Sequence, residues 1–132
     1  MGAIFKIVLI DDDNELSEVV KHNLSALYDL VCFEEPNAAL EYLKHHYVSG
    51  VILDYHLEHT NGISVAWELI EKFPLTPILF VSADRSVKER ISELEFPHVL
   101  YLPKPFVGSE LRSCMVKLLR SVSQVQPPHL NF

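Results

Sequence analysis

The chain has 132 residues, of which 48% are hydrophobic, and this is enough for one domain with a substantial core. Its 18 Asp and Glu residues against 11 Lys and Arg residues give a formal net charge of -7, which disfavours nonspecific attraction to nucleic acid or to an anionic membrane and favours protein partners. No apolar run is long enough to span a membrane and no signal peptide is recognisable, so we expect a cytoplasmic protein with reduced cysteines at Cys32 and Cys114.

Strands and helices are predicted to alternate in the first half of the chain. Residues 4–10 form an apolar run typical of a strand, and a helix with apolar residues at helical spacing follows. A short strand is predicted at 30–33, and Pro36 suits the first turn of the next helix. The inner faces of these two helices are predicted to be formed by Leu16, Val19, Val20, Leu24 and Leu27, and by Ala39, Leu40, Leu43 and Tyr47.

The same alternation continues in the second half. Strands are predicted at 51–54, 77–82 and 99–102, each followed by a helical pattern. The helix after 77–82 has the weakest apolar repeat, so we expect it to be the most mobile, and Ser109 is a possible cap of the last helix. The three inner faces are predicted to contain Ile63, Ala66, Trp67 and Ile70, then Val87, Ile91 and Leu94, and finally Val107, Leu111, Met115, Leu118 and Val122.

Five strands alternating with five helices predict an α/β fold, namely a doubly wound five-stranded parallel sheet with helices on both faces. We expect this single domain to occupy residues 1–122. Residues 123–132 show no periodicity and contain Pro127-Pro128, so they are interpreted as a disordered tail or the stub of a linker.

Polar side chains gather where the predicted strands end. Asp54 ends an uncharged strand, and 11–13 is a run of three aspartates directly after the first strand. If the two strands are neighbours, these carboxylates converge at one edge of the sheet, where like charges repel and raise one another's pKa. A bound cation resolves this conflict. Ser82 and Lys104 end two further strands and would add a hydroxyl and an ammonium group to the same edge.

Four short motifs follow in this order at predicted strand ends: Asp11-Asp12, Asp54, Ser82-Ala83 and Lys104-Pro105. Together they resemble the receiver domains of two-component response regulators, and the resemblance covers residues 4–121. It implies a flavodoxin-like (βα)5 fold and a signalling domain, not an enzyme, that assists its own phosphotransfer and autodephosphorylation.

The resemblance implies that Asp54 is the phosphoacceptor and takes a phosphoryl group from the phosphohistidine of a sensor histidine kinase or histidine phosphotransfer protein. It also implies a Mg²⁺ ion held directly by Asp12, Asp54 and the backbone carbonyl of His56, with Asp11 acting through water. Such a site suits Mg²⁺, which usually keeps several waters. No other cofactor is expected, because the loop after the first strand lacks the Ser, Thr and Gly residues of a flavin-phosphate cradle.

Three further residues have roles implied by the resemblance. Lys104, the Ser82 hydroxyl and the Ala83 backbone N–H would contact phosphoryl oxygens, and a cis bond before Pro105 would turn the lysine inward. Ser82 and Tyr101 would form the switch: Ser82 moves toward the phosphoryl group and Tyr101 turns into the vacated space. This would change a surface that binds a downstream protein target.

The sequence departs from the common family pattern in the loop after the acceptor, where Leu57-Glu58 replaces the usual Met-Pro. Val99 and Leu100 replace the acidic pair that helps many DNA-binding regulators to dimerise, so a homodimer stays possible without this support. Since no output domain follows residue 122, we expect either a stand-alone receiver or one excised from a longer protein, and we predict no direct binding of nucleic acid or membrane by this chain.

The aspartates also fit three other interpretations. Residues 11–13 alone are also typical of a solvated turn with a helix cap. A phosphatase of the haloacid dehalogenase type would use Asp11 as its nucleophile with Asp13 beside it, but Asp54 would then have no role. A pseudo-receiver would keep the fold and work without phosphate, although all the key polar positions are filled here.

Overall fold

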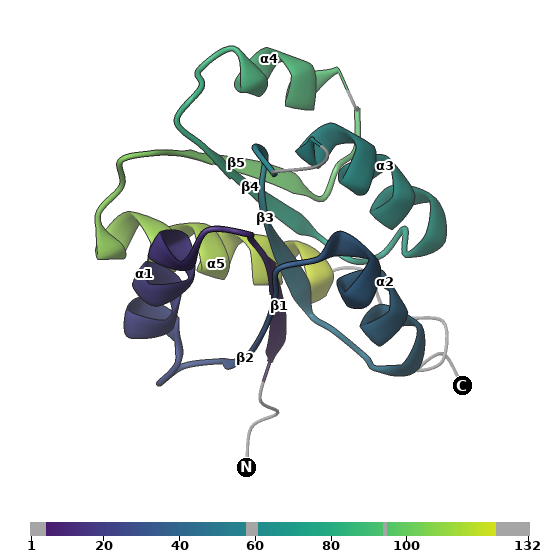
Figure 1. Cartoon of the computed structure of the whole chain (residues 1–132), viewed down its shortest axis with the longest axis horizontal. Helices are drawn as coiled ribbons and strands as arrows, with labels where there is room; N and C mark the ends of the chain where they lie inside the picture. The colour runs from purple at the N-terminus through teal and green to yellow at the C-terminus, as the bar shows by residue number, and fades with distance from the viewer. Residues whose placement is uncertain (1–4, 58–60, 94, 124–132) are drawn as a thin grey trace.

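The computed structural model describes residues 5–57, 61–93 and 95–123, and five strands alternate with five helices along the chain. The strands are β1 (Lys6–Ile10), β2 (Asp29–Phe33), β3 (Gly50–Asp54), β4 (Ile78–Ser82) and β5 (Val99–Pro103). The helices are α1 (Asn14–Leu24), α2 (Pro36–His45), α3 (Gly62–Lys72), α4 (Val87–Ser92) and α5 (Gly108–Ser123). The strands form one parallel sheet in the order β2-β1-β3-β4-β5, which confirms the doubly wound α/β prediction (Figure 1).

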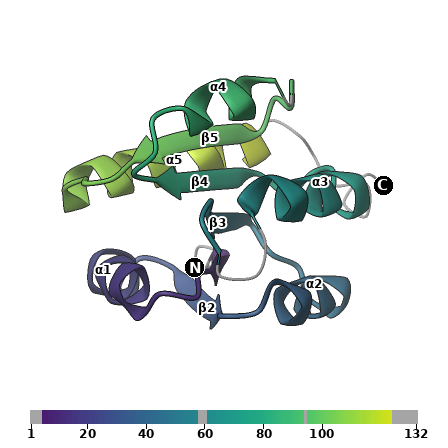
Figure 2. The same ribbon diagram turned by 45° about the horizontal axis from the view of Figure 1, so that its top comes forward.

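The three central strands are the most deeply buried because helices cover both of their faces. All five residues of β3 and of β4 are buried, whereas most residues of the edge strands β2 and β5 are partly exposed. The apolar runs that predicted the central strands therefore reflect burial on two sides. This arrangement brings the carboxyl end of β3 to the middle of one edge of the sheet (Figure 2).

Alternate side chains of the strands point into two separate cores. Val8, Val51 and Phe80 pack with α2, α3 and α4 on one face, and Ile7, Ile52 and Leu79 pack with α1 and α5 on the other. Cys32 and Cys114 lie at the second core as free cysteines, as the sequence predicted. Among the described residues, no helix is long and apolar enough to cross a membrane.

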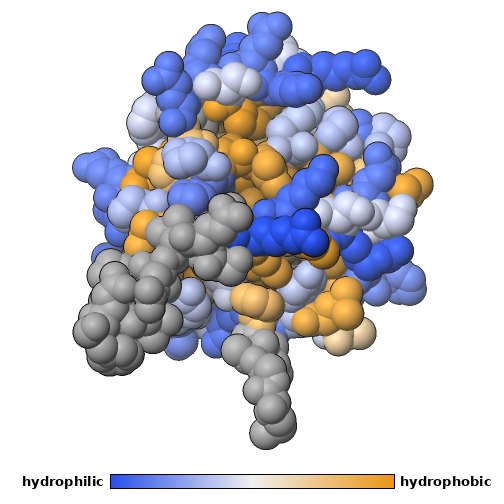
Figure 3. All heavy atoms as spheres, turned by 180° about the vertical axis from the view of Figure 1, so that it is seen from behind, coloured by the Kyte–Doolittle hydropathy of each residue, from blue (hydrophilic) through white to orange (hydrophobic). Residues whose placement is uncertain are grey.

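Several apolar side chains assigned to inner helix faces are in fact exposed. Trp67 was expected in the core but is 52% exposed, because α3 turns Val65, Ala66 and Leu69 toward the sheet. The same correction applies to Val19, Leu27, Tyr47 and Val107. Seen from behind, hydrophobic residues reach the surface between hydrophilic ones (Figure 3). Leu94 and the side chain of Val122 lie outside the described residues.

The helix caps also refine the predictions. Ser109 lies inside the first turn of α5 and so does not precede the helix; the carboxylate of Glu110 instead accepts a hydrogen bond from the Val107 backbone N–H at 2.9 Å. Asp13 caps α1 by accepting from the Glu15 N–H at 3.0 Å. Since α5 extends through Ser123, the predicted boundary at 122 falls within the helix, and the tail from 124 lies outside the described residues.

Candidate functional site at the carboxyl edge of the sheet

The register of the sheet brings Asp11 and Asp54 together. β1 and β3 pair in parallel, and the last pair of the register is Ile10 opposite Leu53. Asp11 follows Ile10 and Asp54 follows Leu53, so the two aspartates lie side by side. Both carboxylates are nearly inaccessible to solvent, with 2% and 4% of the residue exposed. The structure therefore brings one carboxylate of the predicted cluster, that of Asp11, beside Asp54.

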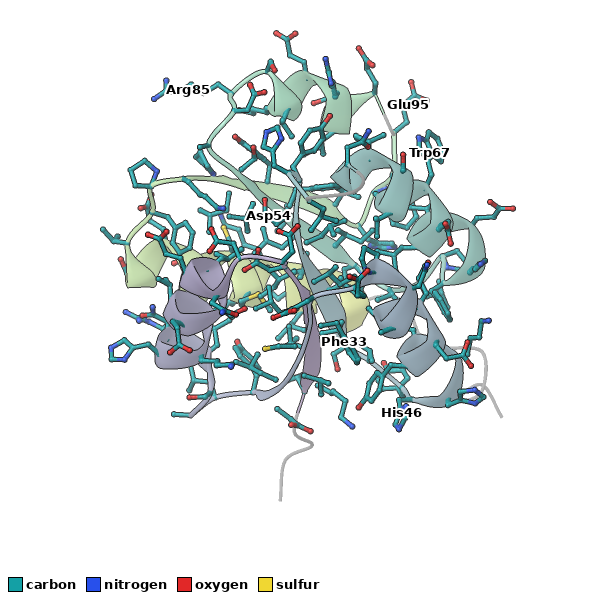
Figure 4. The ribbon with its side chains drawn as sticks, viewed as in Figure 1. Phe33, His46, Asp54, Trp67, Arg85 and Glu95 are labelled. Atoms are coloured by element: carbon teal, nitrogen blue, oxygen red, sulfur yellow. The ribbon has the colours of Figure 1, made fainter. Side chains whose placement is uncertain are left out.

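Asp54 lies near the centre of the molecule (Figure 4), and both of its carboxylate oxygens have partners. Its Oδ2 lies 3.3 Å from the Nζ of Lys104, and its Oδ1 accepts a hydrogen bond from the His56 backbone N–H at 3.1 Å. The lysine reaches this position from the loop after β5, where the Lys104-Pro105 bond is cis, as the resemblance implied. A buried carboxylate with one ammonium partner is thereby fixed at the centre of the edge.

Asp11 lacks comparable compensation. Its Oδ1 accepts from the Asp13 backbone N–H at 3.0 Å, but its Oδ2 is buried and has no hydrogen-bond partner. The pKa of Asp11 is raised to about 7: burial is the largest cause and the neighbouring Asp54 adds to it, while the Asp13 N–H and the Lys104 charge act in the opposite direction. When both are ionised, Asp11 and Asp54 therefore carry more negative charge than the single Lys104 ammonium neutralises.

This pair fits a divalent cation, because the orphaned Asp11 oxygen lies at a buried carboxylate cluster. Asp12, in contrast, lines a cavity of about 280 Å³ with Glu34, Glu35 and Glu68, beside α2 and α3. Within the described part of the chain, no three Asp, Glu, His or Cys side chains gather closely enough to hold a metal. The structure therefore assembles Asp11 with Asp54, and the full ligand set with Asp12 and the His56 carbonyl stays a prediction.

Ser82 and Ala83 lie beside this pair at the end of β4. Ser82 is fully buried, its Oγ accepts from the Asp84 N–H at 3.0 Å, and its backbone oxygen accepts from the Lys104 N–H at 2.9 Å. Ala83 is exposed and lines a hollow of about 360 Å³ together with Lys104 and Pro105. The hydroxyl and the lysine are consequently linked through the backbone of adjacent strand ends.

Tyr101 contacts the same segment from β5. Its hydroxyl donates to the Ser82 carbonyl at 3.1 Å and to the Asp84 carbonyl at 3.3 Å. Partial burial of the ring raises the pKa of its phenol. The two residues predicted to form a switch are thus in direct contact through main-chain oxygen atoms.

Two side-chain contacts near the site had no part in the sequence-based prediction. His56 Nε2 lies 3.8 Å from the Oδ2 of Asp84, which joins the loops after β3 and β4. Tyr55, next to Asp54, accepts a hydrogen bond through its hydroxyl from the Arg90 guanidinium at 3.0 Å. These pairs join residues far apart in the sequence, and no periodicity or motif in the chain indicates them.

Gly62 begins α3, and its contacts show why this position needs a glycine. A Cβ there would lie 2.7 Å from the Tyr55 Cα and 3.0 Å from the Asp54 carbonyl oxygen. The Gly62 N–H also donates to the Tyr55 carbonyl at 2.6 Å. Only glycine permits this close approach, so the start of α3 lies directly against the residues at the end of β3.

Comparisons with known proteins agree with this geometry. The model of the family "Response regulator receiver domain" matches residues 7–115. Response regulator MprA of Mycobacterium sp. (strain KMS) is 32% identical over 124 residues, covering 93% of this chain and 54% of MprA. The probable transcriptional regulator ycf27 of Porphyridium aerugineum is 30% identical over 120 residues, covering 90% of this chain and 50% of that protein. The chain thus spans about half the length of these curated relatives.

Solved structures show the same fold at lower identity. The signal receiver domain of an HD domain-containing protein from Pseudomonas fluorescens Pf-5 aligns with a TM-score of 0.84 at 21% identity, covering 94% of this chain and 93% of that one. The chemotaxis response regulator CheY4 of Vibrio cholerae aligns with a TM-score of 0.78 at 20% identity, covering 89% and 100%. With the flavodoxin-like sheet and the family match over 7–115, the chain belongs to the receiver domains of two-component response regulators.

Proposed function

We propose that Asp54 accepts a phosphoryl group in a Mg²⁺-dependent reaction and that the phosphorylated domain signals to a protein target. One observation carries the proposal: Asp54 is buried at the end of the central strand with the Lys104 ammonium 3.3 Å from one oxygen and Asp11 beside it. A carboxylate used only for stability would not be placed beside a second, uncompensated carboxylate.

In the proposed reaction, a carboxylate oxygen of Asp54 attacks the phosphorus of a phosphohistidine. A new P–O bond forms, the P–N bond breaks, and its electron pair stays on the imidazole nitrogen, so that an acyl phosphate and a histidine result. The Lys104 ammonium, already on Asp54 Oδ2, is placed to pair with a phosphoryl oxygen. The Ser82 hydroxyl and the Ala83 backbone N–H would donate to the other oxygens.

When bound, Mg²⁺ would neutralise phosphoryl oxygens and permit one anion to approach another. Asp11 and Asp54 are the carboxylates that this structure brings together for it. Asp12 and the His56 carbonyl complete the proposed ligand set. Loss of the phosphoryl group to water, assisted by the same residues, would reset the domain.

Signalling is proposed to run through Ser82 and Tyr101, because both meet at the loop that leads into α4. The donor would be a sensor histidine kinase or histidine phosphotransfer protein, and the location cytoplasmic. The net charge of -7 favours a protein target over direct contact with nucleic acid or membrane. The proposal is also compatible with a homodimer.

The test is intact mass after treatment with acetyl phosphate or phosphoramidate, with and without Mg²⁺. We expect one labile phosphoryl group that requires Mg²⁺ and is absent from Asp54→Asn. Uptake that persists in this variant would disprove the assignment. A label on Asp11 would instead indicate chemistry of the haloacid dehalogenase type, although Asp13, the expected partner of Asp11, is engaged as the cap of α1. A complete lack of uptake would favour a pseudo-receiver.

A further inference from the structure

We propose that the hydrogen bond between Tyr55 and Arg90 positions α4 relative to the strand that carries Asp54, and that it sets how readily α4 responds to phosphorylation. The inference rests on the proposed function of Asp54. It makes Tyr55 and Arg90 positioning residues for the response, separate from the contact of Tyr101 with Ser82.

The Tyr55 end of this bond is firmly held. Tyr55 directly follows Asp54 and is 4% exposed. Its N–H donates to the Val81 carbonyl at 3.1 Å, which extends the β3–β4 ladder, and its carbonyl accepts from Gly62. The ring packs against Phe80 with the centroids 6.4 Å apart. The phenol hydroxyl is therefore a fixed point of the sheet beneath α4.

The Arg90 end lies on a weakly anchored element. α4 has six residues, and only Val87 and Ile91 are buried. The Arg90 Nη1 donates to the Tyr55 hydroxyl at 3.0 Å, which joins the helix to the residue directly after β3. Because few apolar contacts hold this short helix, a single directional hydrogen bond has a large relative effect on its position.

The start of α4 is tied to the proposed phosphoryl site by a different route. The Ser82 Oγ accepts from the Asp84 N–H, and the Tyr101 hydroxyl donates to the Asp84 carbonyl. Movement of Ser82 toward a phosphoryl group would thus displace the loop that leads into α4. Arg90 would stay tied to the stationary Tyr55, so the Tyr55–Arg90 bond opposes the displacement. Removing it should make the response easier.

The chain contains its own reporter for this movement. Trp67 is the only tryptophan in the sequence, and it is 52% exposed on α3 (Figure 4). It lines a groove of about 410 Å³ between α3 and α4 together with Tyr55 and Arg90. A shift of α4 changes the polarity around the indole, so the Trp67 emission should report it.

The experiment titrates beryllofluoride, a phosphoryl mimic, in the presence of Mg²⁺ and follows Trp67 emission and the backbone amide shifts of α4. Tyr55→Phe removes only the hydroxyl and keeps the buried ring. We expect its half-maximal concentration to fall by about threefold, a modest change because solvent competes for the exposed Arg90. Tyr42→Phe is the matched control. Tyr42 lies on α2, away from the groove between α3 and α4, and its hydroxyl accepts a hydrogen bond from Lys6 of β1. This variant should titrate like the parent.

A double-mutant cycle shows whether the two residues act as a pair. Arg90→Gln should lower the midpoint as Tyr55→Phe does, and the double variant should equal either single variant. Lys88→Gln, which removes an exposed charge from the same helix, should leave the midpoint unchanged. The inference would be overturned by any of three results: additive effects of the two substitutions, an unchanged midpoint in Tyr55→Phe, or α4 signals of the parent that do not respond to beryllofluoride.

Phosphoryl uptake, measured by intact mass after acetyl phosphate treatment, separates this inference from the proposed function. If the parent and Tyr55→Phe take up the phosphoryl group equally but also titrate equally, the coupling is wrong and the acceptor assignment stands. If the parent takes up none, the proposed function fails and the coupling fails with it.

Discussion

Replacing Asp11 with asparagine should stabilise the metal-free protein at neutral pH. The Asn side-chain oxygen can still accept from the Asp13 N–H, while its amide can donate to Asp54 in place of the orphaned Oδ2. The gain comes from removing a buried negative charge that has no partner of its own. Asp11 is thus a residue whose ionisation the fold resists.

The pH dependence follows from the pKa of Asp11, which burial raises to about 7 in the folded state, against about 3.9 in an unfolded chain. Below about pH 4 the carboxyl is protonated in both states, and the parent and Asp11→Asn should be similarly stable. Between about pH 4 and 7 the unfolded chain ionises first, so the parent loses stability relative to the variant as the pH rises. Above about pH 7 the difference should be constant.

A shift of about three pKa units corresponds to about 4 kcal/mol if it is fully expressed. We expect about half, on the order of 2 kcal/mol, because the fold relaxes around a charge and Asp11 and Asp54 share their repulsion. For a domain of this size, this is a difference in melting temperature of about 8 °C.

The measurement is urea unfolding of the parent and Asp11→Asn in EDTA, at constant ionic strength, from pH 4 to 8. Ser17→Ala, which changes a small buried polar residue of α1, is a control whose stability difference should not depend on pH in this range. Parallel stability curves for the parent and Asp11→Asn would show that Asp11 does not carry an unfavourable buried charge, and the argument for a cation at this edge would lose its basis.

Two further predictions concern the same edge of the sheet. If Mg²⁺ binds with a dissociation constant of about 1 mM, then about 10 mM Mg²⁺ should raise the free energy of unfolding by about 1.4 kcal/mol and the melting temperature by about 5 °C. Asp54→Ala should lose this gain. A gain of the same size in the variant would exclude Asp54 as a ligand. Gly62→Ala should cost about 1–3 kcal/mol in urea unfolding, because its Cβ has no space beside Tyr55; an unchanged midpoint would mean that the loop after Asp54 yields easily.

The sequence was sufficient to predict the strands and the polar groups that end them, whereas the pairing of the first strand with the third was only assumed. Uncharged runs identified the buried strands, a parallel sheet puts Asp11 and Asp54 at the same edge, and the structure shows that their two strands are neighbours. The sequence was less informative about where neighbouring side chains point. Asp11 and Asp12 are adjacent in sequence, but Asp11 lies beside Asp54 and Asp12 lines the cavity near α2, since successive residues at a strand end face different ways.

Helix faces and tertiary side-chain contacts explain the remaining differences. The apolar pattern of α3 includes Trp67, but the buried stripe is completed by Val65, Ala66 and Leu69, which leaves the indole exposed. An apolar residue at the boundary of a stripe satisfies the same periodicity as one at its centre. The contact of Tyr55 with Arg90 depends on how α4 lies over the sheet, and this position is not encoded in any local pattern.

Asp11 connects the stability of this domain to its proposed function, because the two should respond in opposite directions to one substitution. Lys104 supplies one positive charge to two buried carboxylates, so the metal-free site keeps an excess of negative charge. Asp11→Asn removes the excess and should stabilise the fold, but it also removes an oxygen that fits a cation and should slow phosphoryl uptake at Asp54. A structural aspartate would lose stability on substitution, and an indifferent surface aspartate would change neither property. Higher stability together with slower uptake is therefore the signature of a carboxylate kept for a metal ion.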